Sequence, residues 1–121
     1  MGKKILVIDD DPSILKLATT ILQGAAYEVV TASDGEEGLK KAQTESPALI
    51  ISDLMLPKLD GWRVCQKLKT DPRYKHIPVI LSSSLLGDGT GKDEVGLGDA
   101  FVVKPFEPQA LLDRVRTLLG A

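Results

Sequence analysis

Short hydrophobic runs alternate along this chain with longer segments in which hydrophobic residues recur every three or four positions. The runs lie near residues 4–8, 27–32, 48–52, 77–82 and 100–103. Each has the length of a β-strand, and a continuous hydrophobic run indicates a strand buried on both faces of a parallel sheet. The alternation of such strands with helical segments predicts an α/β fold with five parallel strands.

Residues that favour helix starts precede the segments with helical spacing. Asp11-Pro12 predicts an N-cap followed by proline in the first turn. Ser33 and Glu36 have the spacing of a capping box, which predicts the start of a second helix. Asp60-Gly61 precedes a third helix, which Asp71-Pro72 ends. The clearest helical spacing lies in the last segment, at Leu111, Leu112, Val115, Leu118 and Leu119.

Residues 84–98 interrupt this alternation, because five glycines stand where a helix is expected. Each glycine inside a helix costs ~1 kcal/mol relative to alanine, so we expect the fourth helix to be short or irregular. Gly89-Thr90-Gly91-Lys92 is similar to part of a P-loop, but Leu86 replaces the first glycine and Asp93 the hydroxyl residue of that motif. We therefore do not interpret this stretch as a nucleotide-binding loop.

The composition narrows the class of protein. With 121 residues, the chain is expected to form a single domain, residues 1–121. The net charge is −2 with both signs interspersed, so the sequence gives no reason to expect direct binding of nucleic acid. No hydrophobic run is long enough to span a bilayer, and the single Cys65 excludes an internal disulfide. These observations predict a cytoplasmic protein without a membrane partner.

Charged and hydroxyl side chains stand where four of the predicted strands end. Asp9-Asp10 follow the first run, Asp53 the third, Ser82-Ser83 the fourth and Lys104 the fifth. Because the carboxyl ends of parallel strands meet at one edge of a sheet, these side chains are expected to lie together. Two carboxylates ~4 Å apart repel by about 4 kcal/mol at an effective dielectric constant of 20. The sequence therefore predicts a site for Mg²⁺ and a phosphoryl group at this edge.

Four stretches, residues 5–12, 53–61, 78–83 and 101–106, together resemble the receiver domain of two-component response regulators. The resemblance extends over essentially the whole chain. It implies a flavodoxin-like, doubly wound sheet of five parallel strands with helices on both faces. It also implies that Asp53 is the phosphoacceptor, which attacks a phosphohistidine and forms an aspartyl phosphate.

The resemblance assigns roles to the other residues at this edge. Asp10, Asp53 and the backbone carbonyl of Met55 match the direct ligands of Mg²⁺, and Asp9 matches an acid that holds the ion, usually through water. Lys104 matches the ammonium group that pairs with the phosphoryl oxygens. In the family, the bond from this lysine to the following proline, here Pro105, is cis.

Two further positions match the residues that respond to phosphorylation. Ser83 matches the switch hydroxyl, and Ser82 is an alternative one register away. Phe101 matches the aromatic residue that moves inward with the hydroxyl. Met55 and Leu85 stand at positions that influence hydrolysis of the phosphoryl group in the family. Since neither can orient a water molecule, we expect slow autodephosphorylation in a domain that is otherwise not an enzyme.

The resemblance implies a sensor histidine kinase or histidine phosphotransfer protein as phosphodonor, and an unidentified downstream protein as target. Two alternatives remain. Asp9 and Asp11 also fit the Asp-x-Asp motif of haloacid-dehalogenase-like phosphatases, in which Asp9 would be the nucleophile. A receiver-like module that binds partners without phosphorylation is the second alternative, although such modules typically lack an acid or the lysine.

Overall fold

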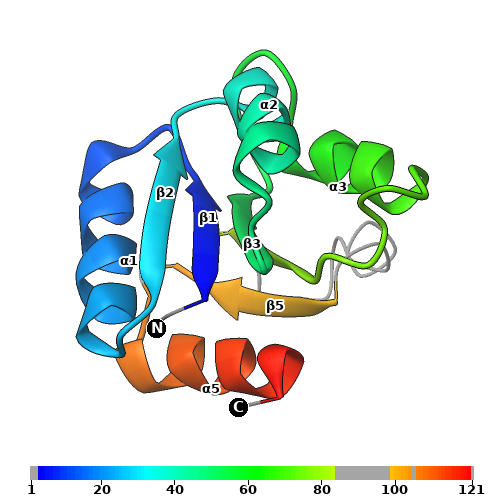
Figure 1. Ribbon diagram of the computed structural model, residues 1–121. Coiled ribbons are helices and arrows are strands. Elements are labelled where there is room, and N and C mark those ends of the chain that lie inside the picture. The colour runs from blue at the N-terminus through cyan, green and yellow to red at the C-terminus, as the bar shows by residue number, and fades with distance from the viewer. Residues whose placement is uncertain (1–2, 84–98, 105, 121) are drawn as a thin grey trace.

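The computed structural model describes residues 3–83, 99–104 and 106–120. One sheet of five parallel strands forms the centre, in the order β2-β1-β3-β4-β5 (Figure 1). The predicted α/β architecture is thus confirmed, with strand ends within two residues of those expected. The elements in chain order are β1 (Lys4–Ile8), α1 (Pro12–Gly24), β2 (Glu28–Ala32), α2 (Gly35–Glu45), β3 (Leu49–Asp53), α3 (Gly61–Lys69), β4 (Val79–Ser83), β5 (Ala100–Val103) and α5 (Pro108–Leu119).

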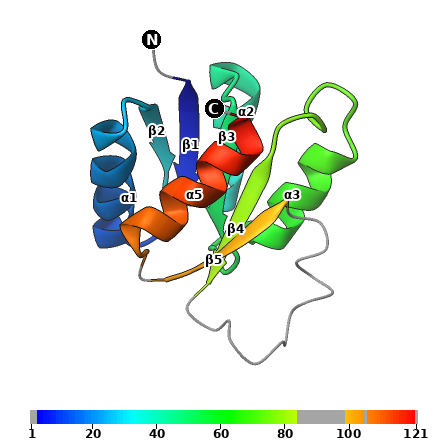
Figure 2. The same cartoon turned by 90° about the horizontal axis from the view of Figure 1, so that it is seen from below.

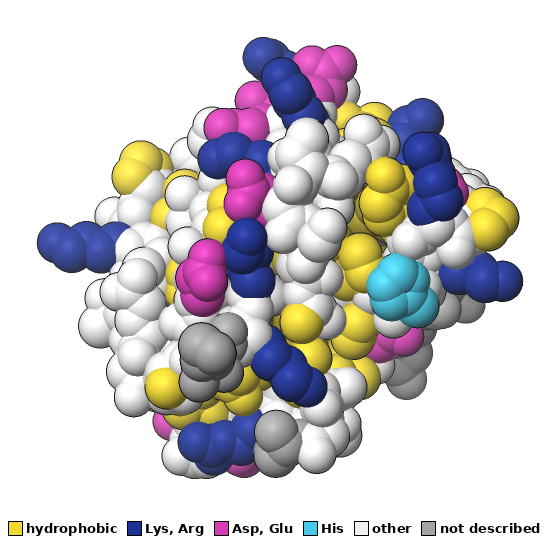
Figure 3. Space-filling model, viewed as in Figure 1, with side chains coloured by type: hydrophobic (Ala, Val, Ile, Leu, Met, Phe, Trp, Pro, Cys, Tyr) yellow, Lys and Arg dark blue, Asp and Glu magenta, His cyan; other side chains and the backbone are white. Residues whose placement is uncertain are grey.

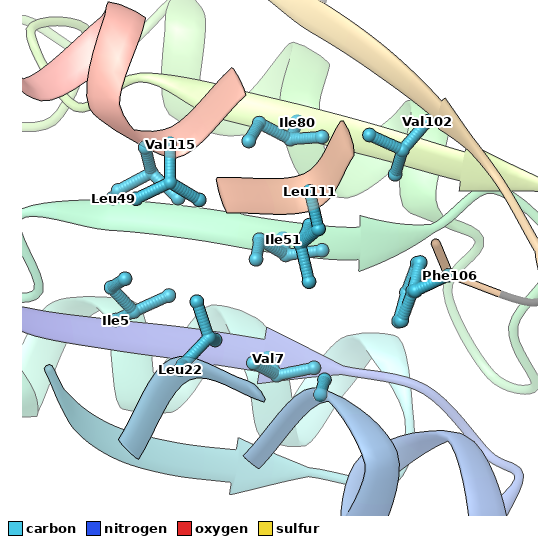
Figure 4. Close-up of a cluster of buried hydrophobic side chains, with 11 residues drawn as sticks. Ile5, Val7, Leu22, Leu49, Ile51, Ile80, Val102, Phe106, Leu111 and Val115 are labelled. Atoms are coloured by element: carbon cyan, nitrogen blue, oxygen red, sulfur yellow. The ribbon is translucent and has the colours of Figure 1, made fainter. Parts of the chain in front are cut away.

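Helices cover both faces of the sheet, with α1 and α5 in front of the strands and α2 and α3 behind them in Figure 2. Each face has its own hydrophobic cluster. The first joins alternate strand residues such as Ile5 and Ile51 to Leu22 of α1 and Leu111 of α5 (Figure 4). The second joins the intervening strand residues, such as Leu6, to α2 and α3. Burial on both faces explains the continuous hydrophobic runs.

The helix starts follow the capping residues. Asp11 caps α1 by accepting a hydrogen bond from the Ser13 N–H at 2.9 Å, as predicted. The capping box predicted for α2 was wrong by one residue. Asp34, and not Ser33, is the N-cap, and its carboxylate accepts from the Glu37 N–H at 2.7 Å. The Glu37 carboxylate accepts in turn from the Ser33 N–H, so the reciprocal arrangement extends to the residue before the cap.

The expected short fourth helix and the P-loop-like stretch, both within residues 84–98, lie outside the described residues, as does Leu85. Pro105 also lies outside them, and with it the expected cis bond. Within the described part of the chain, no helix has the length and hydrophobicity that a membrane crossing requires. Lys and Arg side chains are interspersed with Asp and Glu on the face that Figure 3 shows.

Candidate functional site

Three carboxylates meet at the carboxyl edge of the sheet, as the strand ends predicted. Asp9 and Asp10 directly follow β1, and Asp53 is the last residue of β3, the strand beside β1. One carboxylate oxygen from each residue lies within 4.8 Å of the others. Asp9 and Asp53 are buried, whereas Asp10 is exposed to solvent. The set consists of hard oxygen donors, the ligand type that Mg²⁺ prefers, so the residues fit such an ion.

Lys104 bridges the two buried carboxylates. It follows β5, and its Nζ lies 3.0 Å from Asp9 Oδ2 and 3.1 Å from Asp53 Oδ2. Only 13 % of the Lys104 side chain is exposed, so these contacts are poorly screened by water. The other oxygen of Asp9 accepts a hydrogen bond from the Asp11 N–H at 2.9 Å. Asp9 is therefore held from two sides, while Asp10 faces solvent.

The electrostatics of the cluster leave one negative charge poorly compensated. Burial and the nearby charge of Asp9 raise the pKa of Asp53 above its ordinary value, although Lys104 acts in the opposite direction. Burial also disfavours the Lys104 ammonium, but the hydrogen bonds to Asp9 and Asp53 outweigh this effect and raise the pKa of Lys104. The lysine thus stays charged at neutral pH, and a further positive charge at the cluster would stabilise Asp53 in its ionised form.

A tightly packed loop, residues 54–60, joins Asp53 to α3. The Gly61 N–H donates to the Leu54 carbonyl at 3.0 Å, and a Cβ at Gly61 would overlap the carbonyl oxygen of Asp53. Only glycine therefore allows α3 to begin this close to the end of β3. In the loop, the Met55 N–H points to Asp53 Oδ1 at 3.5 Å, and 63 % of the Met55 residue is exposed.

The candidate switch residues lie on neighbouring strands. Ser82 and Ser83 are both buried at the end of β4, and Ser82 lies opposite Asp53 in the sheet register. Successive strand residues point to opposite faces, so Ser83 shares the face of Leu81, which belongs to the cluster against α2 and α3. Phe101 of β5 is half-buried against that same cluster. Ser82 instead shares the face of Ile80, on the side of α1 and α5.

A cleft of about 630 Å³ opens beside the acidic residues. Trp62 forms part of its wall, half-buried at the start of α3, and its indole nitrogen is buried without a hydrogen-bond partner. Cys65, one turn further along α3, lies in the core, as expected. The cleft is lined by Asp10, Leu54, Met55, Leu56, Pro57, Asp60, Trp62 and Arg63.

The charge of Lys104 was expected among the acids, and its contacts with Asp9 and Asp53 agree with that expectation. One structural role at the site was not predicted from the sequence, namely the close approach of Gly61 to Asp53. The Asp60-Gly61 pair was visible as a helix start, and a glycine directly after an N-cap is the one indication that could have revealed it.

Comparisons with known proteins agree with this geometry. The model of the response regulator receiver domain family matches residues 5–116. A probable transcriptional regulator, ycf27 of Cyanophora paradoxa, is 47% identical over 119 residues, which cover 97% of this chain and 48% of that protein. The chain thus spans about half the length of the curated relatives it matches.

Solved structures extend the likeness to three dimensions. A putative response regulator from Chloroflexus aurantiacus has a TM-score of 0.93 at 30% identity, with both chains covered completely. The response regulator TrrA of Thermotoga maritima, solved in complex with Mg²⁺-BeF, has a TM-score of 0.87 at 33% identity, and 97% of this chain and 99% of that chain are covered. The family match, the strand order and the acidic edge agree, and the chain belongs to the response regulator receiver domains of two-component systems.

Proposed function

We propose that this receiver domain accepts a phosphoryl group on Asp53, with Mg²⁺ held by Asp10, Asp53 and the Met55 carbonyl and with Asp9 supporting the ion through water. The observation that carries the proposal is the meeting of Asp9, Asp10 and Asp53 within 4.8 Å, with Lys104 against two of them. The Mg²⁺ in the Thermotoga maritima complex supports the choice of ion.

The chemistry of transfer follows from this arrangement. An Asp53 carboxylate oxygen attacks the phosphorus of a phosphohistidine, the new P–O bond replaces the P–N bond, and the electron pair of that bond leaves with the histidine nitrogen. When bound, Mg²⁺ neutralises the phosphoryl oxygens as charge develops on them. Lys104 stands 3.1 Å from Asp53, near enough to pair with an oxygen of the transferred group.

Phosphorylation would then act through Ser83 and Phe101. Both lie on the side of the sheet that faces α2 and α3, which favours Ser83 over Ser82 as the hydroxyl coupled to Phe101. A phosphoryl group on Asp53 offers new hydrogen-bond acceptors to this hydroxyl, and movement of the hydroxyl opens space for the aromatic ring. The two-state equilibrium shifts by as much as phosphorylation favours one arrangement over the other.

The proposed partners follow from family membership. A sensor histidine kinase or a histidine phosphotransfer protein supplies the phosphoryl group, and a downstream protein of unknown identity recognises the phosphorylated state. The relative from Cyanophora paradoxa is described as a transcriptional regulator, so an output on DNA would require a part that this receiver does not supply. We also propose that one receiver unit accounts for residues 1–121 and that it acts in the cytoplasm.

The domain is regulatory, and we propose that its own phosphatase activity is slow. Met55 is exposed beside the acids and carries no group that can orient a water molecule toward the phosphorus. Phosphoryl acceptance on Asp53 accounts for the cluster of Asp9, Asp10, Asp53 and Lys104 without a phosphatase activity toward other substrates. Asp9 and Asp53 are both buried and both paired with Lys104, but the second oxygen of Asp9 accepts a hydrogen bond from the Asp11 N–H at 2.9 Å, whereas the Met55 N–H lies 3.5 Å from that of Asp53. Asp53 therefore has the less engaged oxygen, which disfavours Asp9 as the nucleophile of the haloacid-dehalogenase alternative.

The decisive experiment is to incubate the chain with Mg²⁺ and a small phosphodonor such as acetyl phosphate, and to map the modified residue by mass spectrometry. Phosphate on Asp53, absent in Asp53→Asn, supports the proposal. Phosphate on Asp9 would support the phosphatase alternative. No phosphate, with no binding of beryllofluoride, would support the module that binds partners without phosphorylation.

The metal assignment has a separate test that needs no phosphodonor. Mg²⁺ should raise the melting temperature of the wild-type chain, since an ion that binds only the folded state stabilises it by ~2.7 kcal/mol at 100 times its Kd. Asp10→Asn removes an exposed ligand and should weaken this response. An unchanged response in Asp10→Asn would contradict the assignment.

A further inference from the structure

The loop that carries Met55 contains a backbone conformation that is unusual for its residue. Lys58 has φ of 67°, in the left-handed region, where non-glycine residues are uncommon. The Leu59 N–H donates to the Pro57 carbonyl at 2.7 Å, so the chain makes a γ-turn centred on Lys58. A γ-turn with positive φ is rare and strained, and such a turn persists only where surrounding structure holds it.

The first turn of α2 supplies that support. A Cβ at Gly35 would overlap the carbonyl oxygen of Leu59, so the helix start packs directly against the backbone of the turn. The Gly35 N–H also points to the Pro57 carbonyl at 3.4 Å. The backbone on both sides of Lys58 is therefore in contact with one residue of α2.

An ion pair adds little to this contact. Lys58 Nζ lies 3.7 Å from Asp34 Oδ2, but 62 % of the Lys58 side chain is exposed. Exposed pairs at this distance are screened by water and contribute little to stability. The backbone contact at Gly35 and the packing of Leu59 against the cluster on the α2–α3 side, and not the charge of Lys58, hold the turn.

The other end of the loop is held just as closely, because Gly61 packs against the Asp53 carbonyl. The loop is thus fixed at Gly61 and at Gly35, with the backbone of Met55 between Asp53 and the turn. We propose that Gly35 and Lys58 are positioning residues for the metal site, through which the start of α2 sets the orientation of the Met55 carbonyl. The inference rests on the proposed function, because it concerns the same Mg²⁺ site.

The test compares two pairs of variants, with Mg²⁺ affinity measured by titration calorimetry on the metal-free chain. Gly35→Ala forces the Leu59 carbonyl away, and we expect its Mg²⁺ affinity to fall about tenfold, as for other residues that orient metal ligands. Gly24→Ala is the matched control, because a Cβ at Gly24 meets nothing within 4 Å. Its affinity should equal that of the wild type.

The second pair separates conformation from charge at Lys58. Lys58→Gly removes the ion pair but permits positive φ, and should keep wild-type Mg²⁺ affinity. Lys58→Val removes the same pair but disfavours positive φ, and should lose affinity about tenfold. If Gly35→Ala does not fold, this pair alone decides. Equal affinity in Lys58→Gly and Lys58→Val would overturn the inference.

The melting temperature of each metal-free variant identifies a merely structural effect, which would lower stability and leave Mg²⁺ affinity unchanged. That result would also overturn the inference, whereas the proposed function would stand as long as the wild type binds Mg²⁺ and Asp10→Asn does not. A wild-type chain that fails to bind Mg²⁺ would overturn both.

Discussion

Replacing Asp53 with asparagine should stabilise the metal-free protein, even though it removes the proposed phosphoacceptor. At an effective dielectric constant of 20, two charges 3.1 Å apart, as Asp53 and Lys104 are, attract by about 5 kcal/mol, and two charges 4.8 Å apart, the upper limit for Asp53 and Asp9, repel by about 3.5 kcal/mol. Repulsion by Asp9 therefore cancels much of the attraction to Lys104, and burial of the Asp53 carboxylate, the largest cause that raises its pKa, then makes the ionised group destabilising. We expect Asp53→Asn to stabilise the metal-free protein by about 1–2 kcal/mol, the usual size of the effect of one substitution.

Thermal unfolding in EDTA at neutral pH measures this difference. For a chain of this size, about 1–2 kcal/mol corresponds to a melting temperature roughly 4–8 °C above that of the wild type. Asp113→Asn is a suitable control, because that carboxylate is exposed on α5 and lies outside the cluster. Mg²⁺ should then raise the melting temperature of the wild type and of the control, but much less that of Asp53→Asn.

The pH dependence of stability gives a second check that the ionised Asp53 carboxylate destabilises the folded protein. The pKa of Asp53 is raised above its ordinary value of 3.8, so the folded state binds this proton more tightly than the unfolded state does. The ionised carboxylate is therefore destabilising above the raised pKa, and this cost disappears as the pH falls through it toward 3.8. The advantage of Asp53→Asn should shrink over that range. A variant less stable than the wild type in EDTA at neutral pH would refute the reasoning.

Two further substitutions and one labelling experiment test the packing and chemistry of the site. Lys104→Met should destabilise the metal-free protein by about 3 kcal/mol in a denaturant titration, because it leaves two buried carboxylates without their cation. Adding Asp53→Asn to Lys104→Met should recover part of this loss. If the effects of the two substitutions on the free energy of unfolding simply add, Lys104 and Asp53 are not energetically coupled. Met55→Asn should speed the loss of phosphate from the phosphorylated chain. If the rate of this loss is unchanged or lower, the apolar side chain of Met55 is not the reason for slow autodephosphorylation. Cys65 should not react with a thiol reagent at pH 8 in the folded state, because burial raises the pKa of its thiol to about 11, and rapid labelling would show that α3 opens readily.

The strands and the acidic edge could be predicted from the sequence because the relevant information is local. A run such as residues 49–53 is hydrophobic on both faces, and its position in a parallel sheet fixes where the following carboxylate lies. The first residue of α2 is ambiguous in the sequence, because Ser33 with Glu36 and Asp34 with Glu37 both have the spacing of a capping box. The structure selects the second pair.

The close backbone contacts could not be predicted in the same way. Gly35 and Gly61 read as ordinary glycines after helix caps, and nothing in their neighbours reveals that a carbonyl from a distant segment lies against each. The left-handed conformation of Lys58 is equally hidden, because lysine has no preference for it. Such features depend on how β3, α2 and α3 pack together, which one sequence does not encode locally.

The central sheet also separates two hydrophobic clusters, which share no residue within the part of the chain that the structure describes. Leu22 belongs to one side and Leu68 to the other, so their truncation to alanine should lower stability by amounts that add. A substitution that repacks α1 or α5 should therefore leave the packing around Phe101, on the other side of the sheet, largely unchanged.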